Sequence, residues 1–166
     1  MEITQRMPLA RPWLRFATLS AGLLLTLAPR ISPLLEAQAT AATSLTVRVT
    51  GARSAKGRIR AALFQDRKGF PNDPSRAVQT QAAGIDPQTL SAQITFGDLR
   101  DGVYAVSVFH DENMNQKLDK DFVGIPKEGY GASNNPKKKI GPPSFEDASF
   151  RLSGVAQQSV EIKLIY

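Results

Sequence analysis

The residues of this sequence with the clearest chemical potential form one polar stretch that begins at Asp111. Counted from Asp111, oxygen-bearing side chains stand at the first, third, fifth and ninth positions, which is the pattern of EF-hand calcium loops. Calcium takes about six to eight oxygen ligands, and alternate residues of a tight loop can turn short carboxylates and amides inward together. We therefore expect a calcium site with these ligands: Asp111, Asn113, Asn115, Asp119 and Asp121.

Two positions of this stretch depart from the calcium-loop pattern. Gln116 stands where a glycine normally makes the sharp turn, and Phe122 stands where a bidentate glutamate normally closes the site. Asp121 or Glu128 would have to supply the missing carboxylate. The alternative is a metal-free run of Asx turns, in which Asp and Asn side chains cap their own backbone. Extracellular calcium sites of this kind have a Kd of about 10⁻⁴–10⁻³ M, and the ion would pin the loop and stabilise the fold.

His110 is the only histidine of the chain and directly precedes these acids. A catalytic interpretation makes His110 the general base of a hydrolase, together with neighbouring carboxylates such as Asp111 and Glu128. No further residue completes such a site, because Ser133 lacks the second glycine of a nucleophile elbow. One histidine without any cysteine also argues against a zinc site. We expect a structural histidine in a protein that is not an enzyme, with the hydrolase as the alternative.

Residues 1–39 have the organisation of a secretory signal peptide. A basic segment with three arginines is followed by an apolar run at positions 16–28 and then by small residues that end at Ala39. The apolar run is shorter than the roughly 20 residues that span a bilayer, so we expect no transmembrane segment in the mature protein. We expect cleavage after Ala39, with cleavage after Ala41 as the alternative. The protein is then exported, to the periplasm or to the exterior.

The composition excludes several classes of site. The 166 residues include no cysteine, which excludes disulfides, thiolate metal sites and cysteine nucleophiles. The whole chain has 21 basic and 15 acidic residues, and removing the four arginines and two glutamates of the leader leaves 17 and 13. Surfaces that bind nucleic acid by stacking have aromatic residues among their basic ones, and the dense basic run Lys137–Lys139 has none. We expect a solvated loop there, and no nucleic-acid partner.

The mature chain is predicted to form one all-β domain over residues 45–166. Apolar residues recur at every second position of short segments between turns, and no segment has helical spacing. The expected strands are 45–50, 57–64, 77–83, 90–96, 103–110, 148–152 and 158–166. Seven such strands predict an antiparallel sandwich of two sheets. The first two strands should form a hairpin, and the strand at 103–110 should be central, because both of its faces are apolar.

A stretch of 36 residues, Asp111–Glu146, interrupts this alternation. Loops of this length inside a compact domain are uncommon and are usually either functional or disordered. This stretch contains Phe122, Ile125, Tyr130 and Phe145, which we expect to anchor it to the sandwich. Its glycines permit tight folding back onto the sheets. The long loop is therefore predicted to be ordered and to carry the function.

Four groups of residues resemble a known family. In chain order they are Leu99-x-x-Gly102-x-Tyr104-Ala105-Val106, His110-Asp111-x-Asn113-x-Asn115-x-x-Leu118-Asp119, Gly124-Ile125-Pro126-x-Glu128-Gly129-Tyr130-Gly131-x-Ser133-Asn134 and Pro142-Pro143-Ser144-Phe145-x-x-Ala148. Together they resemble domain-of-unknown-function family 2141, which comprises exported bacterial proteins without an established activity. The turn before the central strand is also similar to that of transthyretin and carboxypeptidase-regulatory sandwiches. The resemblance implies an immunoglobulin- or transthyretin-like sandwich that serves as a binding or structural module.

We therefore expect an exported, non-catalytic module of the bacterial envelope. Its long loop would present a rigid surface to a protein or glycan partner of the envelope. Calcium is the one cofactor that the sequence suggests.

Overall fold

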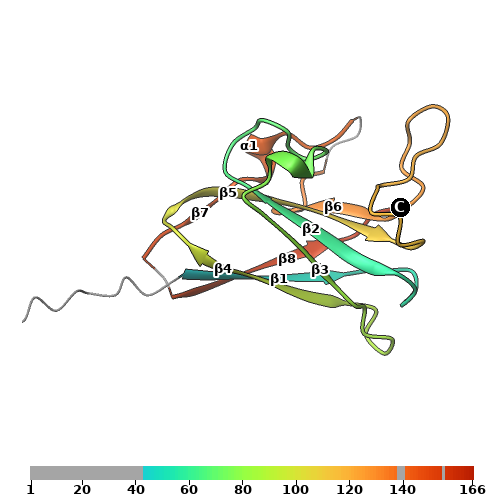
Figure 1. Ribbon diagram of the computed structural model, residues 1–166, viewed down its shortest axis with the longest axis horizontal. Coiled ribbons are helices and arrows are strands. Elements are labelled where there is room, and N and C mark those ends of the chain that lie inside the picture. Colours follow the sequence, from blue (N-terminus) through green and yellow to red (C-terminus); the bar gives the residue numbers. More distant parts are fainter. Residues whose placement is uncertain (1–42, 138–140, 155) are drawn as a thin grey trace, which may run out of the picture. The chain divides into compact units, whose positions relative to one another are not determined.

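The computed structural model describes residues 43–137, 141–154 and 156–166 (Figure 1). The predicted signal peptide and both predicted cleavage positions lie outside the described residues. No helix in the described part of the chain is long and apolar enough to cross a membrane. The elements are, in order, β1 (Thr43–Thr50), β2 (Arg58–Phe64), the 3-10 helix η1 (Pro74–Arg76), β3 (Gln79–Ala83), β4 (Ala92–Leu99), β5 (Gly102–Asp111), β6 (Tyr130–Ala132), α1 (Phe145–Ala148), β7 (Phe150–Leu152) and β8 (Gln157–Lys163).

The strands form two sheets, as expected of a β-sandwich. The smaller sheet has the strand order β4-β1-β8. The larger sheet has the order β3-β2-β5-β6, with β7 also paired to β5. All pairings are antiparallel except that of β1 with β8, which is parallel. The predicted all-β sandwich is confirmed, with one parallel pair that the sequence pattern did not reveal.

The core between the two sheets consists of the residues that alternate toward it. Leu45, Val47 and Val49 of β1 are exposed by 1% or less, as their spacing predicts. Ile59 and Leu63 of β2 belong to the same buried cluster. At about 25 cal/mol per Å² of apolar surface, burial of these aliphatic side chains is the main stabilising term of the fold.

A second, smaller cluster covers the other face of the larger sheet. Ala105 of β5, Ala132 of β6 and Ala148 of α1 are buried there, with Phe70 and Phe145 packed against them. The two phenylalanine rings meet edge to face, with centroids 5.9 Å apart. In Figure 1 the two short helices lie above β5. The strand β5 is therefore central and covered on both faces, as its composition predicts.

The predicted hairpin of the first two strands is wrong. β1 pairs with β4 and β8, whereas β2 pairs with β3 and β5, so the two strands lie in different sheets. Gly51 and Gly57 flank the connection with φ of 80° and 76°, which lets the chain cross between the sheets. Alternation specifies which face of a strand is buried but not which strand lies beside it.

The structure describes residues 111–137 and 141–146 of the long loop, and they are anchored differently from the prediction. It contains β6 and ends in α1, neither of which the sequence pattern indicates. Phe145 packs in the second cluster and Tyr130 is half-buried, as anchors should be. Phe122 and Ile125 are not anchors, because they are 99% and 61% exposed. A bridge between Lys120 and Pro126 turns the chain back at this point, so that the side chains between them project away from the sheets.

Candidate functional site

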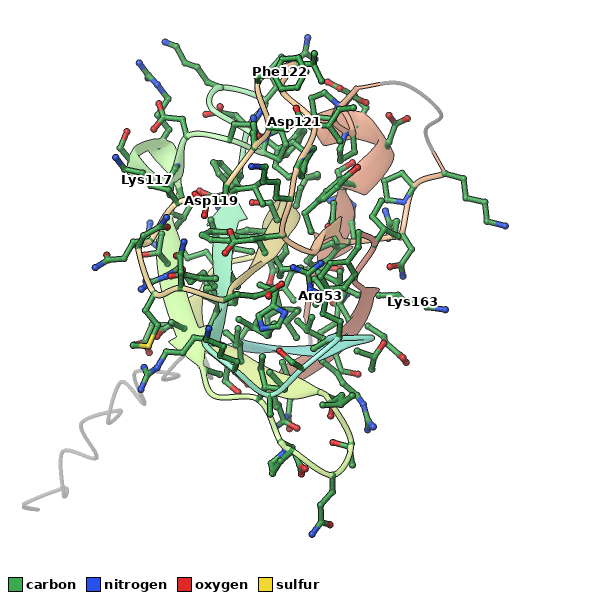
Figure 2. The ribbon with its side chains drawn as sticks, turned by 90° about the vertical axis from the view of Figure 1, so that its right-hand side faces the viewer. Arg53, Lys117, Asp119, Asp121, Phe122 and Lys163 are labelled. Carbon is green, nitrogen blue, oxygen red and sulfur yellow. The ribbon has the colours of Figure 1, made fainter. Side chains whose placement is uncertain are left out.

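The candidate site lies where the end of β5 meets the connection between β1 and β2. In the register of the larger sheet, His110 pairs with Ile59 and Asp111 pairs with Arg58. Both His110 and Asp111 are fully buried. Figure 2 shows the loop that leaves β5, with Phe122 at its far end and Asp119 closer to the sheets.

Within the described residues, the hydrogen bonds to the Asp111 carboxylate all go to one of its two oxygens. Its Oδ2 accepts hydrogen bonds from Arg60 Nε at 2.5 Å and from the Gln116 backbone N–H at 3.0 Å. Its Oδ1 is buried and has no hydrogen-bond partner among the residues that the structure describes. Burying a carboxylate oxygen without a partner is costly, so Asp111 Oδ1 is an atom at which a hydrogen-bond donor or a cation would stabilise the fold.

The stretch after Asp111 folds as the Asx turns that the sequence offers. Asn113 Oδ1 accepts from the Asn115 N–H at 3.0 Å, and Asn115 Oδ1 accepts from the Lys117 N–H at 2.8 Å. Met114 and Gln116 take left-handed φ values of 63° and 68°. Gln116 thus adopts the conformation for which a calcium loop normally uses glycine, at the cost of some strain.

Asp119 brings the two amides together. Asn113 Nδ2 donates to Asp119 Oδ2 at 2.7 Å, and Asn115 Nδ2 donates to Asp119 Oδ1 at 3.0 Å. Asp111 contacts the same loop through Gln116. Four of the five predicted ligands therefore belong to one hydrogen-bonded unit. Among the described residues no three His, Asp or Glu side chains form a group that could hold a metal ion, so amide and backbone oxygens would have to take part.

The other two candidate carboxylates serve the loop backbone. Asp121 Oδ1 accepts from two backbone N–H groups of the loop end, at 3.0 and 2.8 Å. Glu128 is 4% exposed, and its two oxygens accept from the N–H groups of Glu112 and Asp119 at 2.9 and 3.1 Å. Glu128 thereby ties together both ends of the Asp111–Asp119 segment.

Both ring nitrogens of His110 are engaged. Nε2 lies 2.6 Å from the carbonyl oxygen of Lys56, which can only accept, so Nε2 carries the proton. Nδ1 lies 2.8 Å from the hydroxyl of Tyr166, which itself accepts from the Arg53 N–H at 2.9 Å. In the neutral ring, Tyr166 therefore donates to Nδ1. This buried network gives His110 a structural environment.

Arg53 packs on Tyr166, the hydrogen-bond partner of His110. Its guanidinium pairs with Glu112 Oε1 at 2.7 Å, and its Cζ lies 4.7 Å from the ring centroid of Tyr166. Partial burial raises the pKa of Tyr166, and the charges of Glu112 and Glu128 add to this. The hydrogen bond from the Arg53 N–H opposes them. The sequence analysis did not identify Arg53 or Tyr166.

The residues of the catalytic alternative have separate partners. His110 contacts Tyr166 and a backbone carbonyl, Asp111 contacts Arg60, and Glu128 contacts backbone amides. Ser133 is fully buried, and its hydroxyl donates to the Ala148 carbonyl at 2.6 Å. The hydrogen bond of His110 Nδ1 is to the Tyr166 hydroxyl, at 2.8 Å, and the one carboxylate oxygen near this nitrogen among the described residues, Glu112 Oε1, lies farther away at 3.8 Å and pairs with Arg53.

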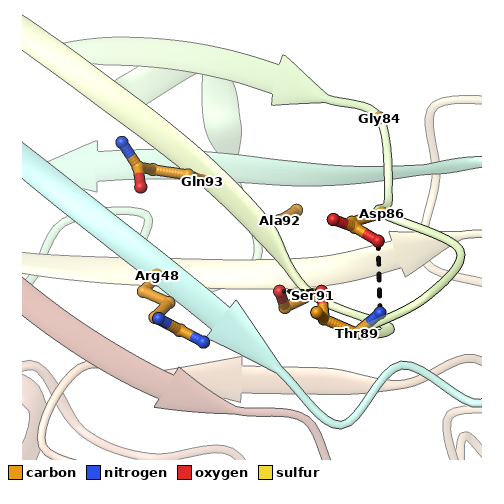
Figure 3. Close-up of a pocket in the computed structure, with 7 residues that line it drawn as sticks. All are labelled: Arg48, Gly84, Asp86, Thr89, Ser91, Ala92 and Gln93. Atoms are coloured by element: carbon orange, nitrogen blue, oxygen red, sulfur yellow. Dashed lines mark hydrogen bonds between the residues drawn. The ribbon is translucent and has the colours of Figure 1, made fainter.

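A pocket of about 350 Å³ lies elsewhere, beside the turn between β3 and β4 (Figure 3). Its polar groups bond to one another, since Asp86 Oδ1 accepts from the Thr89 N–H at 3.1 Å and the Thr89 and Ser91 hydroxyls lie 2.8 Å apart. It shares no residue with the site around His110. Its lining residues are Arg48, Gly84, Asp86, Thr89, Ser91, Ala92 and Gln93.

Comparison with known proteins identifies the family. The chain has no significant match among curated proteins. A family model described as an uncharacterized protein conserved in bacteria, DUF2141, matches residues 47–161. This range runs from β1 to β8 and includes His110 and the loop that follows it. The chain therefore belongs to the DUF2141 family of bacterial proteins.

Proposed function

We propose that this protein is an exported, non-catalytic module of the bacterial envelope whose Asp111–Asp119 loop binds calcium and presents a surface to an envelope partner. Export is inferred from the leader pattern of residues 1–39. The single observation that supports the ion is the buried Oδ1 of Asp111 at the head of an oxygen-rich loop, for which the described part of the chain supplies no hydrogen-bond partner. A bound cation would supply that partner.

The arrangement of the loop supports calcium over other cations. Its candidate ligands are carboxylate and amide oxygens, which suit hard cations. The loop is half-exposed, and calcium tolerates flexible sets of about six to eight oxygens that include water, whereas magnesium demands near-ideal octahedral geometry. In this proposal Asp111, Asn113, Asn115 and Asp119 turn oxygens to the ion. The amides of Asn113 and Asn115 would then release Asp119, to which they now donate.

The environment of His110 supports a non-catalytic role. A general base needs a nitrogen that can take a proton from the substrate. Both nitrogens of His110 are bonded within the protein and its side chain is fully buried. The hydrolase alternative would require Tyr166 to move away from His110 before any substrate could be reached.

Calcium titration tests the ion site. With a Kd near 1 mM, about 10 mM calcium stabilises the native state by about 1.4 kcal/mol, which raises the Tm by about 5 °C. We expect this shift, together with heat in a calorimetric titration of chelator-treated protein. Magnesium at the same concentration should give a smaller shift. If calcium at this concentration gives no heat and no Tm shift, calcium is removed from the proposal.

A matched pair of variants locates the ion. Asp119→Asn should lower calcium affinity about ten-fold, because it removes one ligand charge at nearly constant volume. Asp86→Asn is the control, since Asp86 also caps a turn by accepting from the N–H groups of Gln88 and Thr89 but lies outside the loop. Calcium binding that is equally weakened in both variants, or in neither, would contradict the assignment to this loop.

Mass spectrometry of the chain recovered from a bacterial host tests export. We expect a mature protein that begins at Thr40, or at Ala42 if the alternative position is cut. Replacing both Ala37 and Ala39 with lysine should block cleavage, because small side chains are needed near the cut. An unprocessed chain confined to the cytoplasm would refute the proposed export.

A further inference from the structure

The far end of the loop is an exposed apolar tip that the calcium proposal does not use. We define the loop tip as Phe122, Val123 and Ile125, which are 99%, 62% and 61% exposed. Single exposed apolar residues are ordinary on soluble proteins. A group of three exposed apolar residues within four positions of one turn is unusual. Figure 2 places Phe122 at the end of the loop, beyond Asp121 and Asp119.

Hydrogen bonds within the loop tip fix the conformation of its backbone. Lys120 and Pro126 form a bridge across its base, and the Asp121 N–H donates to the Ile125 carbonyl at 2.8 Å. The Asp121 carboxylate accepts from the N–H groups of Val123 and Ile125 at 3.0 and 2.8 Å. The turn is thus preorganised, and its apolar side chains are directed outward by a backbone whose polar groups are satisfied.

Three lysines flank the loop tip in the sequence. Lys117, Lys120 and Lys127 are exposed and form no ion pair within the described residues. The two acids nearby are engaged in hydrogen bonds, because Asp119 accepts from asparagine amides and Asp121 accepts from the N–H groups of the tip backbone. The loop therefore offers exposed apolar side chains at its tip, with Lys120 and Lys127 at the two ends of the turn that carries them.

We propose that the loop tip inserts into the surface of an anionic phospholipid bilayer. The Phe122 ring and its two aliphatic neighbours would enter the boundary between headgroups and acyl chains. The lysine stems would lie along that boundary while their ammonium groups contact lipid phosphates. A bilayer fits this surface better than a protein partner, because the tip is narrow and convex and lysine is depleted in protein interfaces.

A tryptophan at position 122 reports insertion directly. The sequence has one tryptophan, Trp13, which lies within the predicted leader, so in the cleaved protein the Phe122→Trp variant has a single indole. We expect its emission to shift to the blue on vesicles of phosphatidylcholine mixed with phosphatidylglycerol, and to be quenched by brominated acyl chains. An indole whose emission is unchanged on these vesicles would overturn the proposal.

Vesicle sedimentation measures the contribution of the tip. Phe122→Ser should lower the partition coefficient about ten-fold or more, because it removes the aromatic ring whose transfer from water into the acyl region favours binding. Val78→Ser is the control, since Val78 is also exposed, at 47%, but lies before β3. Equal partitioning of the two variants would overturn the assignment to the loop tip. Binding of the tip to envelope proteins or glycans, without binding to vesicles, would overturn the proposed bilayer partner.

The charge contribution is tested separately. Two changes remove charge and should each weaken binding: Lys120→Glu on the protein, and vesicles of phosphatidylcholine alone on the lipid side. A rise in ionic strength from about 0.1 M to about 1 M should also weaken binding, because it shortens the Debye length from about 10 Å to about 3 Å. The tip turn needs no ion, so binding should persist in chelator. This separates the membrane inference from the calcium proposal. Binding that ignores lipid charge and salt would contradict an anionic surface.

Discussion

Asp111→Ala is expected to lower the free energy of unfolding by about 3 kcal/mol, measured by urea unfolding in the presence of chelator. The substitution leaves Arg60, which is 26% exposed, without its carboxylate, and removes the acceptor of the Gln116 N–H. Breaking a buried ion pair costs about 3–5 kcal/mol. The lower end applies because Arg60 can partly rehydrate. Chelator ensures that the loss reflects the ion pair and not calcium.

Two further variants separate the pair from a general loss of charge. Glu161→Ala removes an exposed carboxylate on β8 and should change stability by no more than about 0.5 kcal/mol. In a double-mutant cycle, Asp111→Ala and Arg60→Ala should show a coupling of about 1–3 kcal/mol, since their side chains contact directly. Additive losses would mean that Asp111 acts through its cap on Gln116 alone.

The strands could be predicted from the sequence because burial and alternation are local properties. β1 shows this, since Leu45, Val47 and Val49 are buried as their spacing requires. The partners of β1 could not be predicted in this way. Its pairing with β8 joins residues more than 100 positions apart, and nothing in an alternating pattern distinguishes a neighbour in the sheet from a neighbour across the core.

The sequence predicts which residues lie at the candidate site, but not which distant residues they form hydrogen bonds with. The Asx turns of Asn113 and Asn115 follow from short side chains that bond their own backbone, which the sequence reveals. The partner of His110 cannot be predicted from the sequence, because Tyr166 lies 56 residues away and is aligned by a bridge between Tyr130 and Ile165. The prediction for Phe122 rests on the preference of aromatic side chains for the core, and it is wrong because the Lys120–Pro126 bridge turns this part of the loop out into solvent.

Gly57→Ala is expected to have the largest effect of any single methyl group added near the site, a loss of about 4 kcal/mol in unfolding free energy. Gly57 has a φ of 76°, and a Cβ there would lie 2.1 Å from the carbonyl oxygen of Asp111 and 2.7 Å from Glu112 Cα. The left-handed conformation costs alanine about 1–2 kcal/mol, and overpacking adds about 1–3 kcal/mol. Because the obstructing atoms belong to the backbone, no side-chain rotation relieves the contact.

A matched control separates the two costs. Gly141 also has a φ of 76°, yet a Cβ there would meet nothing within 4 Å, so Gly141→Ala should lose only the conformational term of about 1–2 kcal/mol. The excess in Gly57→Ala should appear at His110, because the carbonyl of the preceding Lys56 accepts from Nε2. We expect altered nitrogen shifts of the His110 ring in NMR spectra. Equal losses in the two variants, with unchanged His110 shifts, would mean that β2 and the end of β5 can separate without disturbing the buried network.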